Sequence, residues 1–360
     1  MSLKSIEEAN FGDERVLVRV DFNVELDRVA EVEEHFRFDI VKKTIDHIAG
    51  FSGAKIALLC HFGRPQGEPR QKAGRPEGKR DERYSVGQIL FAVERALGRQ
   101  VVFVPDCIGD AVRTALAALP AGSVLLLENT RFYPGEEGND PAFAKALAEP
   151  FSIFVNEAFS VCHRAHASIV GLPKLLPSYA GFRVLEEVEQ LDQVKASPEH
   201  PAIAIIGGAK IETKLPLIRT FEKNYDAILV GGKVANEAID EKIAFSEKVL
   251  LPQDFDSPLR LDIGPNTIAY YIRIIRMAKT IVWNGPMGKF EEKPYDIGTA
   301  AILQAILDSG AFVVIGGGES LAVVEKANAM GRVGFVSSGG GAMLEYLGGQ
   351  ELPGLSALEA

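Results

Sequence analysis

The fold is decided by one run in the second half of the chain, Phe312-Val313-Val314-Ile315-Gly316-Gly317-Gly318-Glu319-Ser320-Leu321. Its apolar, largely β-branched start predicts a buried strand, and a helical pattern begins at Leu321. Glycines between a strand and a helix let the backbone approach a ligand closely, and the amides and helix dipole favour an anion. The run therefore predicts one unit of a parallel sheet with a phosphate-suited turn at the strand end. A tight turn without a ligand is the alternative for this run alone.

Short β-branched runs alternate with helical patterns along the whole chain. The predicted strands of the first half are Val16–Phe22, Lys55–Cys60, Val101–Pro105, Val124–Glu128 and Ile153–Asn156. Those of the second half are Ala202–Ile206, Ala227–Val230, Thr280–Trp283, Phe312–Ile315 and Gly334–Val336. Helical patterns lie between them, for example at Pro141–Ala148 and Ile297–Leu307. This alternation predicts an α/β fold of two doubly wound, Rossmann-like parallel-sheet domains that bind ligands at the carboxyl ends of the strands.

The boundary between the two domains is predicted near Leu176–Gly181. A long helix is predicted over Tyr179–Ala196, ended by Ser197-Pro198, and would connect the domains. We therefore expect a first domain over residues 1–178 and a second over 179–345, with the connecting helix of about 179–196 in the second. The stretch Gly63–Arg83 is rich in glycine, proline and charge, which predicts a surface loop.

Composition excludes several classes of protein. The net charge of −10 argues against a general nucleic-acid binder, and no apolar run reaches the length of a membrane span. The three cysteines, Cys60, Cys107 and Cys162, form no C-x-x-C pair, which fits a reducing cytosol and offers no metal or disulfide framework. The N-terminal residues lack the apolar core of a signal peptide. We therefore expect a cytoplasmic protein with small-molecule partners, no nucleic acid and no membrane, and nothing calls for more than a monomer.

Two lysines and a glutamate mark the second half as the side that holds phosphates. No G-x-x-x-x-G-K-[ST] motif occurs, and the 316–321 glycine run lacks the last glycine of the dinucleotide fingerprint. Lys210 and Lys214 are four residues apart after Gly207-Gly208, which places both on one helix face at a strand end. An anion between them would offset their repulsion, whereas two solvated lysines are the plain alternative. Glu319 suits Mg²⁺ rather than the phosphate itself.

Arginines and histidines cluster in the first half. His163-Arg164-Ala165-His166 follows the strand ending at Asn156, and a metal pair is disfavoured because no third ligand stands nearby. Arginines at or just past strand and helix ends favour a small-anion pocket over separate surface ion pairs; they are Arg19, Arg37, Arg64, Arg131 and Arg164. Asp21 and Asn23 could accept hydrogen bonds from a substrate hydroxyl.

The two halves together suggest phosphoryl transfer between a nucleotide and a small phosphorylated acid. No Ser-His-Asp or Cys-His arrangement shows in the spacing. None is needed if the acceptor is a carboxylate, because its pKa near ~4 leaves it ionised at pH 7. Catalysis would then depend on positioning and charge neutralisation rather than on a base.

Eight segments in order resemble the phosphoglycerate kinase family, from about residue 15 to about residue 355. They are Arg19–Val24, His61–Pro65, Glu128–Phe132, His163–Ser168, Gly207–Lys210, Trp283–Gly288, Gly316–Gly318 and Ser338–Ala342. The resemblance implies two Rossmann-like domains joined by a helix and hinges, with a C-terminal tail of about 346–360 returning to the first domain. It implies the reversible transfer of a phosphoryl group from 1,3-bisphosphoglycerate to Mg-ADP, giving 3-phosphoglycerate and ATP, with domain closure to exclude water.

The resemblance also implies roles for individual residues. The 3-phosphoglycerate site would be Asp21, Asn23, Arg37, His61, Arg64, Arg131, His163, Arg164 and His166. The ATP or ADP site, with Mg²⁺ at Glu319 through the nucleotide, would be Gly208, Lys210, Lys214, Gly231, Gly232, Asn284, Glu291, Gly317, Gly318, Glu319 and Ser320. Arg37 and Lys214 would meet the transferring phosphoryl group, and the amides of Gly317-Gly318 and Gly339-Gly340 would face it.

Several positions depart from the family's pattern. Glu319 replaces the usual Asp, Lys289 stands where an apolar residue usually lies near the adenine, and the small residues within Asn156–Cys162 have grown. The chain is also shortened between Ala238 and Val249 and between Pro252 and Leu261, beside the nucleotide pocket. The second hypothesis is therefore a phosphoglycerate-binding relative with impaired nucleotide use. A third, an unrelated two-domain dehydrogenase, is disfavoured by the missing dinucleotide fingerprint.

Overall fold

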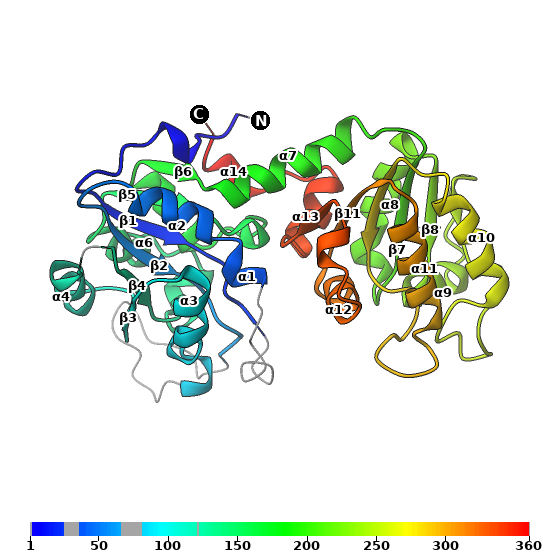
Figure 1. Cartoon of the computed structure of the whole chain (residues 1–360), viewed down its shortest axis with the longest axis horizontal. Coiled ribbons are helices and arrows are strands. Elements are labelled where there is room, and N and C mark those ends of the chain that lie inside the picture. The colour runs from blue at the N-terminus through cyan, green and yellow to red at the C-terminus, as the bar shows by residue number, and fades with distance from the viewer. Residues whose placement is uncertain (1, 25–35, 66–80, 121, 360) are drawn as a thin grey trace. The chain divides into compact units, whose positions relative to one another are not determined.

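The computed structural model describes residues 2–24, 36–65, 81–120 and 122–359. The chain divides into two compact units, which are described separately (Figure 1). Unit 1 comprises Met1–Glu186 with Leu352–Ala360, and unit 2 comprises Glu187–Glu351. The expected surface loop over 63–83 lies largely outside the described residues.

Unit 1 is built on a six-stranded parallel sheet in the order β3-β4-β2-β1-β5-β6. Its strands are β1 Arg15–Arg19, β2 Lys55–Leu59, β3 Val101–Val104, β4 Val124–Leu127, β5 Ile153–Asn156 and β6 Ser178–Ala180. Its helices include α1 Phe36–Asp39, α2 Lys42–Ala49, α3 Leu90–Leu97, α4 Asp110–Ala118, α5 Pro134–Glu137, α6 Pro141–Ala148 and α14 Pro353–Ser356. The chain leaves β1 toward β2 on one side and returns to pair β5 on the other. The carboxyl end of β1 is therefore the topological switch point, where ligands bind in such sheets.

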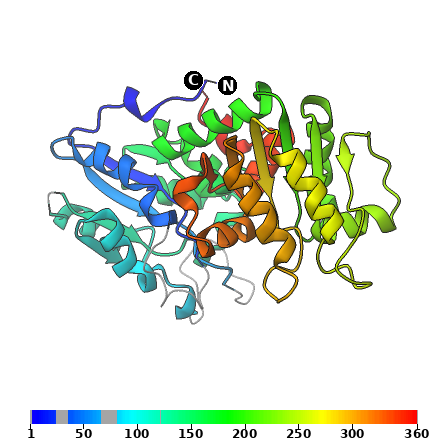
Figure 2. The same ribbon diagram turned by 45° about the vertical axis from the view of Figure 1, so that its right-hand side comes forward.

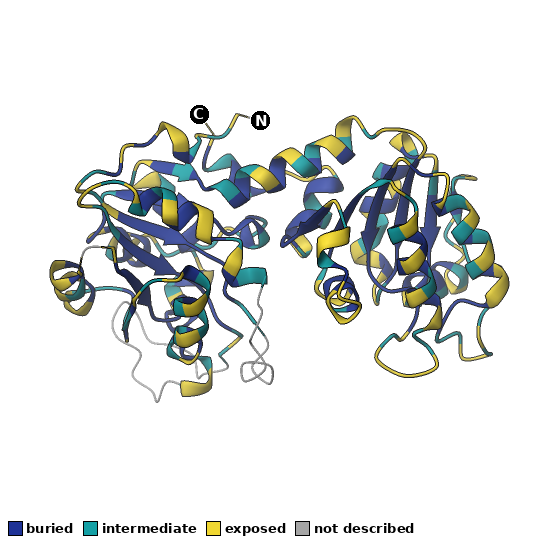
Figure 3. Ribbon diagram, viewed as in Figure 1, coloured by how far each residue is buried: buried dark blue, intermediate teal, exposed yellow. Residues whose placement is uncertain are grey.

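The central strand β1 shows why the sheet is covered on both faces. Val16 and Val18 pack in a core with residues of α2 and α3, whereas Leu17 packs in a second core with residues of α4 and α6. Side chains alternate across a strand, so an uninterrupted apolar run needs a layer on each face. Figure 3 shows the strands of this sheet as buried over most of their length.

Unit 2 repeats this architecture with a six-stranded parallel sheet in the order β12-β11-β10-β7-β8-β9. Its strands are β7 Ala202–Ile206, β8 Ala227–Val230, β9 Val249–Leu250, β10 Thr280–Asn284, β11 Phe312–Gly316 and β12 Phe335–Ser337. Its helices are α8 Ile211–Asn224, α9 Gly232–Asp240, α10 Pro265–Ile275, α11 Ile297–Asp308, α12 Gly318–Lys326 and α13 Gly341–Leu347. Helices α10, α11 and α12 share one core with the sheet (Figure 2). The switch point lies between β7 and β10, where two glycine turns meet.

The predicted fold class is confirmed, and its ten strands are all present with end shifts of a few residues. Two edge strands, β6 and β9, and the helices α5, α9, α13 and α14 were not predicted. The connecting helix α7, Phe182–Ala196, begins after the predicted Tyr179 because Ser178–Ala180 pairs with β5. Its first amides are capped from elsewhere in unit 1. The Phe182 amide donates to Thr44 Oγ1 at 3.0 Å and the Arg183 amide donates to Glu157 Oε1 at 3.0 Å.

The division between the units falls within α7, at Glu186 and Glu187, and again at Glu351 and Leu352. The sequence-based boundaries of 178 and 345 precede these points and place the whole helix in the second domain. The segment after Leu352 belongs to unit 1. The Gly354 amide donates to the Cys162 carbonyl at 2.8 Å, and the Lys4 amide donates to the Leu358 carbonyl at 3.1 Å. A Cβ at Gly354 would lie 2.8 Å from Cys162 Cα, so this contact requires glycine.

Candidate active site

The basic residues singled out in the sequence come together at the carboxyl edge of the unit 1 sheet. We call them the basic cluster: Arg19, Arg37, His61, Arg64, Arg131, His163, Arg164 and His166. Arg19 ends β1, His61 follows β2, Arg131 follows β4, and the 163–166 segment follows β5. Because parallel strands end at one edge, residues distant in sequence are brought to one place. The field of this cluster appears in the pKa of Arg131, which burial lowers and which Arg164, Arg19 and Arg64 lower further against an opposing effect of Glu137.

Asp21 and Arg37 form an ion pair at this edge. The Asp21 carboxylate also accepts hydrogen bonds from Ser160 Oγ at 2.5 Å and from the Asn23 amide at 3.1 Å. Burial raises the pKa of Asp21, but Arg37, His61 and these hydrogen bonds outweigh it and bring the pKa to about 2. The expected hydrogen-bond acceptors of a substrate hydroxyl are therefore already engaged in part, and Asn23 Oδ1 likewise accepts from the Gly63 amide at 2.7 Å.

Arg19 is fully buried and organises the cluster from beneath. Its Nε donates to Ser168 Oγ at 2.9 Å, and its NH2 lies 3.2 Å from His61 Nδ1. Burial and the charge of Arg19 hold the pKa of His61 well below its ordinary value. The imidazole is thus neutral at pH 7, and the contact with Arg19 assigns Nδ1 as the acceptor. His61 can therefore donate one hydrogen bond from Nε2 without adding charge.

The outer part of the cluster contains the buried Arg131, the half-buried Arg164 and the exposed Arg64. Arg131 NH1 donates to the Gly63 carbonyl at 2.6 Å, and Nε lies 3.1 Å from Glu137 Oε1. Arg164 Nε donates to His163 Nε2 at 3.1 Å, while Arg64 is exposed. Burial and the arginines lower the pKa of His166 to about 4. Guanidinium groups, not imidazolium groups, thus supply the positive charge of this cluster at neutral pH.

In unit 2 the switch point is a contact between two glycine turns. The Gly207 amide donates to the Asn284 carbonyl at 2.9 Å, and Gly285 has φ +91. A Cβ at Gly285 would lie 2.3 Å from the Gly207 carbonyl oxygen, so no other residue fits. The Gly285 amide donates to the buried Ser320 Oγ at 2.7 Å. The Ser320 hydroxyl, predicted to hold nucleotide, therefore first fixes this turn.

Lys214 is the partly buried cation of this region. Its ammonium group donates to Asn284 Oδ1, and Asn284 Nδ2 donates to the Gly316 carbonyl at 2.7 Å. Burial lowers the pKa of Lys214 to about 8, despite the opposing effect of Glu319. Lys210, by contrast, is exposed at the residue that precedes α8. The two lysines thus differ in burial, and an anion would stabilise the buried charge of Lys214.

The glycine runs end two strands and begin two helices. Gly317 has φ +99 and directly precedes α12, and Gly340 has φ +49 and directly precedes α13. The Gly339 amide donates to Ser337 Oγ at 3.0 Å, so it is engaged within the protein. Of the predicted Gly339-Gly340 pair, the Gly340 amide is the better placed to meet a ligand.

A cavity of about 670 Å³ opens beside these turns, and we call it the nucleotide cavity because its size suits a nucleotide. Four predicted residues line it, namely Gly208, Gly232, Glu291 and Glu319. The sequence-based prediction missed Lys233, Asn236 and Asp240, which lie at helical spacing on the unpredicted α9. It also missed Leu259, Arg260 and Leu261, which lie in an irregular stretch before α10. Four of them, Asp240, Leu259, Arg260 and Leu261, flank or lie within the segments noted as shortened, so the shortened chain still builds a wall of the cavity. Lys289 also lines it, with its ammonium 2.5 Å from Glu292 Oε1.

The remaining predicted nucleotide residues are not among those lining this cavity. Lys210, Lys214, Gly231, Asn284, Gly317, Gly318 and Ser320 lie at the neighbouring strand ends and glycine turns. In the described ranges no group of three or more His, Cys, Asp or Glu side chains could hold a metal ion. Mg²⁺ typically takes one or two carboxylates together with substrate phosphates, and the exposed carboxylate of Glu319 fits that mode. No helix within the described part of the chain is long and apolar enough to cross a membrane.

Two parallel α/β units, one with a basic cluster and the other with glycine turns and a lysine at its switch point, define an enzyme of the phosphotransferase class. Comparison with known proteins then identifies the family. The chain belongs to the phosphoglycerate kinase family, whose model matches residues 6–250 and 238–350. Its reaction is therefore phosphoryl transfer with a carboxyl group as acceptor, between 1,3-bisphosphoglycerate and ADP.

Relatives of the same name match over the full length. The phosphoglycerate kinase of Rhodospirillum centenum is 40% identical over 409 aligned residues, which cover 100% of both chains. That of Moorella thermoacetica is 37% identical over 403 residues, covering 99% of each. Among solved structures, phosphoglycerate kinase from Pyrococcus horikoshii OT3 has a TM-score of 0.85 at 29% identity, covering 99% of this chain and 98% of that one. The Coxiella burnetii enzyme has a TM-score of 0.77 at 28% identity, with the same coverage.

These matches decide between the hypotheses. The alternative of impaired nucleotide use is not supported, because the family model continues through 238–350 and the named enzymes match throughout. The hypothesis of an unrelated dehydrogenase is wrong, because the chain belongs to the phosphoglycerate kinase family. An alignment of 409 positions against a chain of 360 residues agrees with the shortening noted in the sequence.

Proposed function

We propose that the basic cluster binds the phosphoglycerate and that the nucleotide cavity binds ADP or ATP, with Lys214 stabilising the transferred phosphoryl group. The observation that carries this assignment is the state of Lys214, whose pKa is lowered to about 8 by burial and whose ammonium contacts no carboxylate of the described residues. A buried, poorly compensated cation beside glycine turns is stabilised by an arriving phosphate.

The basic cluster supports binding of a small acid with several negative charges. Arg37, Arg64, Arg131 and Arg164 would provide planar donors suited to carboxylate and phosphate oxygens. Neutral His61, His163 and His166 would donate or accept single hydrogen bonds at the rim of the site. Asp21 and Asn23 would orient Arg37 and the Gly63 turn, since both already hold those groups.

On the nucleotide side, the wall formed by Gly208 and Gly232 leaves room for a flat base, because neither residue carries a side chain. Lys210 would bind the outer phosphates from its exposed position. Asn284 would hold Lys214, and Ser320 would hold the Gly285 turn. The amides of Gly317, Gly318 and Gly340 would contact the phosphoryl oxygens. Mg²⁺, held by Glu319 and the nucleotide phosphates, would neutralise charge on the phosphates.

No general base is needed in this mechanism. The acceptor in the reverse direction is the carboxylate of 3-phosphoglycerate, which is ionised at neutral pH. The protein would therefore position two anions and neutralise their repulsion, and Arg37 and Lys214 would do so during transfer. We also propose that the protein acts as a cytoplasmic monomer, in keeping with its three buried reduced cysteines.

The test is the reverse reaction, 3-phosphoglycerate with Mg-ATP, coupled to a dehydrogenase that consumes the product with NADH. Turnover should require both substrates and Mg²⁺. Calorimetry should then compare Arg131→Gln with the wild-type protein for each ligand alone. The two proteins should bind Mg-ADP with equal affinity, whereas their affinities for 3-phosphoglycerate should differ. Equal phosphoglycerate affinity in both proteins would overturn the assignment of the basic cluster, whatever the turnover.

A further inference from the structure

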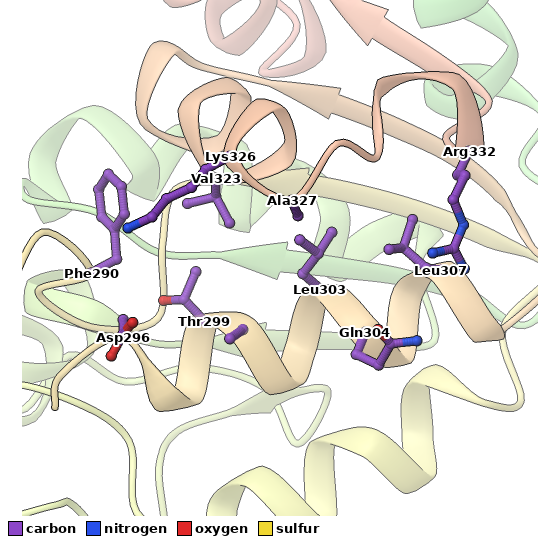
Figure 4. A pocket seen from close by; sticks show the side chains of 11 residues that line it. Phe290, Asp296, Thr299, Leu303, Gln304, Leu307, Val323, Lys326, Ala327 and Arg332 are labelled. Atoms are coloured by element: carbon purple, nitrogen blue, oxygen red, sulfur yellow. The ribbon is translucent and has the colours of Figure 1, made fainter. Parts of the chain in front are cut away.

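Unit 2 contains a second cavity that the reaction does not use. It measures about 320 Å³, at the lower end of the range for small-molecule sites, and lies between α11, α12 and the segment Phe290–Asp296 (Figure 4). None of its lining residues lines the nucleotide cavity. We propose that it is a separate binding site for a small carboxylate with an apolar body, such as an aryl or branched-alkyl acid.

The floor of this cavity is apolar and well ordered by packing. Leu303 of α11 and Val323 of α12 are buried members of the unit 2 core, and their exposed edges form the floor. The Phe290 ring closes one end. Thr299 at the same end uses its Oγ1 to accept the Met287 amide at 3.0 Å, which fixes the wall that it contributes. An apolar body of one ring or a short branched chain would replace water over this floor favourably.

Two cations stand at opposite ends of the floor. Figure 4 shows Lys326 extending along the cavity toward Phe290 and Arg332 lying beside Leu307 at the far end. The ammonium group of Lys326 has no hydrogen bond or ion pair within the described residues. Arg332 reaches Asp308 only at 3.9 Å, while Asp308 accepts a closer hydrogen bond from Gln304 Nε2 at 2.8 Å. Both cations are therefore available to a ligand.

The balance of charge selects an anion. Asp296 is the single acidic residue in the lining, against Lys326 and Arg332. A guanidinium beside an apolar surface suits a carboxylate, because it can donate two parallel hydrogen bonds while its plane rests on the hydrocarbon. A cationic ligand would meet two like charges, and a neutral one would leave both cations unused. The site thus ranks ligands of one shape in the order anion, neutral molecule, cation.

The experiment uses three probes of matched shape on the intact protein: 3-phenylpropionate, 3-phenylpropanol and 3-phenylpropylamine. Ligand-observed saturation-transfer NMR should give a dissociation constant on the order of 1 mM for the acid, as expected for so small a ligand, with weaker binding of the alcohol and the amine. Saturating Mg-ADP should not abolish the signal, since the nucleotide occupies the other cavity. Absence of acid binding, or amine binding as tight as the acid, would overturn the proposal.

Substitutions in the lining of this cavity test whether the acid binds there. Arg332→Gln should weaken acid binding about tenfold by removing a charge-assisted hydrogen bond, and Lys326→Gln tests the other end of the floor. Ala300→Phe fills the cavity from an exposed position on α11 and should abolish binding, with turnover and thermal unfolding as checks on the fold. Arg273→Gln, an exposed arginine on α10 outside both cavities, is the matched control and should bind like wild type. Wild-type affinity in Arg332→Gln and Ala300→Phe would refute the site.

Discussion

Replacing Lys214 by methionine should make the protein more stable and less active at once. The ordinary lysine pKa of 10.5 falls to about 8 in the folded protein because the ammonium is buried. At 1.36 kcal/mol per pKa unit, that depression means the folded state carries the charge at a penalty of ~3 kcal/mol. Lys214→Met removes this penalty but also loses the hydrogen bond to Asn284, which costs ~1 kcal/mol. The free energy of unfolding of the variant should therefore be ~2 kcal/mol higher than that of the wild type at pH 7.

The sign of the pH dependence provides an internal check. Below pH 8, Lys214 is charged in both folded and unfolded protein, and the full penalty applies. Between pH 8 and about 10.5, the unfolded chain holds more protons, so the stability contributed at this position rises with pH. The advantage of Lys214→Met should therefore be largest near pH 7 and shrink as the pH approaches 10.5. Differences between variants cancel the other groups that titrate in this range.

Trp283 makes the assay specific to unit 2. It is the only tryptophan in the sequence, is fully buried in β10 and directly precedes Asn284. Urea unfolding followed by its fluorescence should show the gain for Lys214→Met and no change for Lys210→Met, whose lysine is exposed. Turnover of Lys214→Met should fall 10²–10³-fold, with phosphoglycerate affinity little changed. Equal or lower stability at pH 7, or a gain independent of pH, would refute the reasoning.

Three further changes test other parts of the site. Asp21→Asn should lower the free energy of unfolding by ~2 kcal/mol at pH 7, because the carboxyl pKa is about 2 in the folded protein against an ordinary 3.8. This contribution is present above pH 4 and is lost as the pH falls toward 2, so denaturation at pH 7 and pH 3 should show a smaller difference between the two proteins at pH 3. A constant difference would exclude the pairing with Arg37 as its cause. Arg131→Lys should raise the Michaelis constant for 3-phosphoglycerate about tenfold and leave that for Mg-ATP unchanged, and a change confined to Mg-ATP would contradict the basic cluster's role. Gly285→Ala should lower the free energy of unfolding by more than ~3 kcal/mol, whereas Gly310→Ala, also at positive φ but with open space around it, should lower it by only ~1 kcal/mol. Equal shifts in melting temperature for the two variants would show that backbone strain, and not the steric contact at Gly285, causes the loss of stability.

The sequence predicted the elements whose own side chains determine them. The central strands were found because apolar runs such as Ala202–Ile206 are buried on both faces and are bounded by turns. The edge strands were missed because β6 and β9 have three and two residues and are defined by the neighbour with which each pairs. The start of α7 was misplaced for the same reason, since its cap is supplied by Thr44 and Glu157 from distant segments.

The candidate site shows a similar division. Motif residues such as Lys214 and Asn284 could be named because strand ends and glycine turns place them, and the structure brings them into contact. The walls of the nucleotide cavity could not be named, because Leu259 and Leu261 lie in an irregular stretch with no period. The sequence also did not show which predicted ligand-binding groups are engaged within the protein. The Ser320 hydroxyl, for example, accepts a hydrogen bond from the Gly285 amide.

The path of the chain has a consequence for how this protein is made. Residues Leu352–Ala360 complete unit 1, although all of unit 2 is synthesised before them. During translation, unit 2 is made as one continuous segment. Unit 1 is begun first but is completed last, because its final segment makes the Gly354–Cys162 hydrogen bond and the pairing of Leu3 with Glu359. A released chain that ended after residue 351 would thus contain all of unit 2 but would lack the last segment of unit 1. Removing residues 352–360 should therefore destabilise unit 1, to which they belong, and not unit 2, which directly precedes them in the sequence.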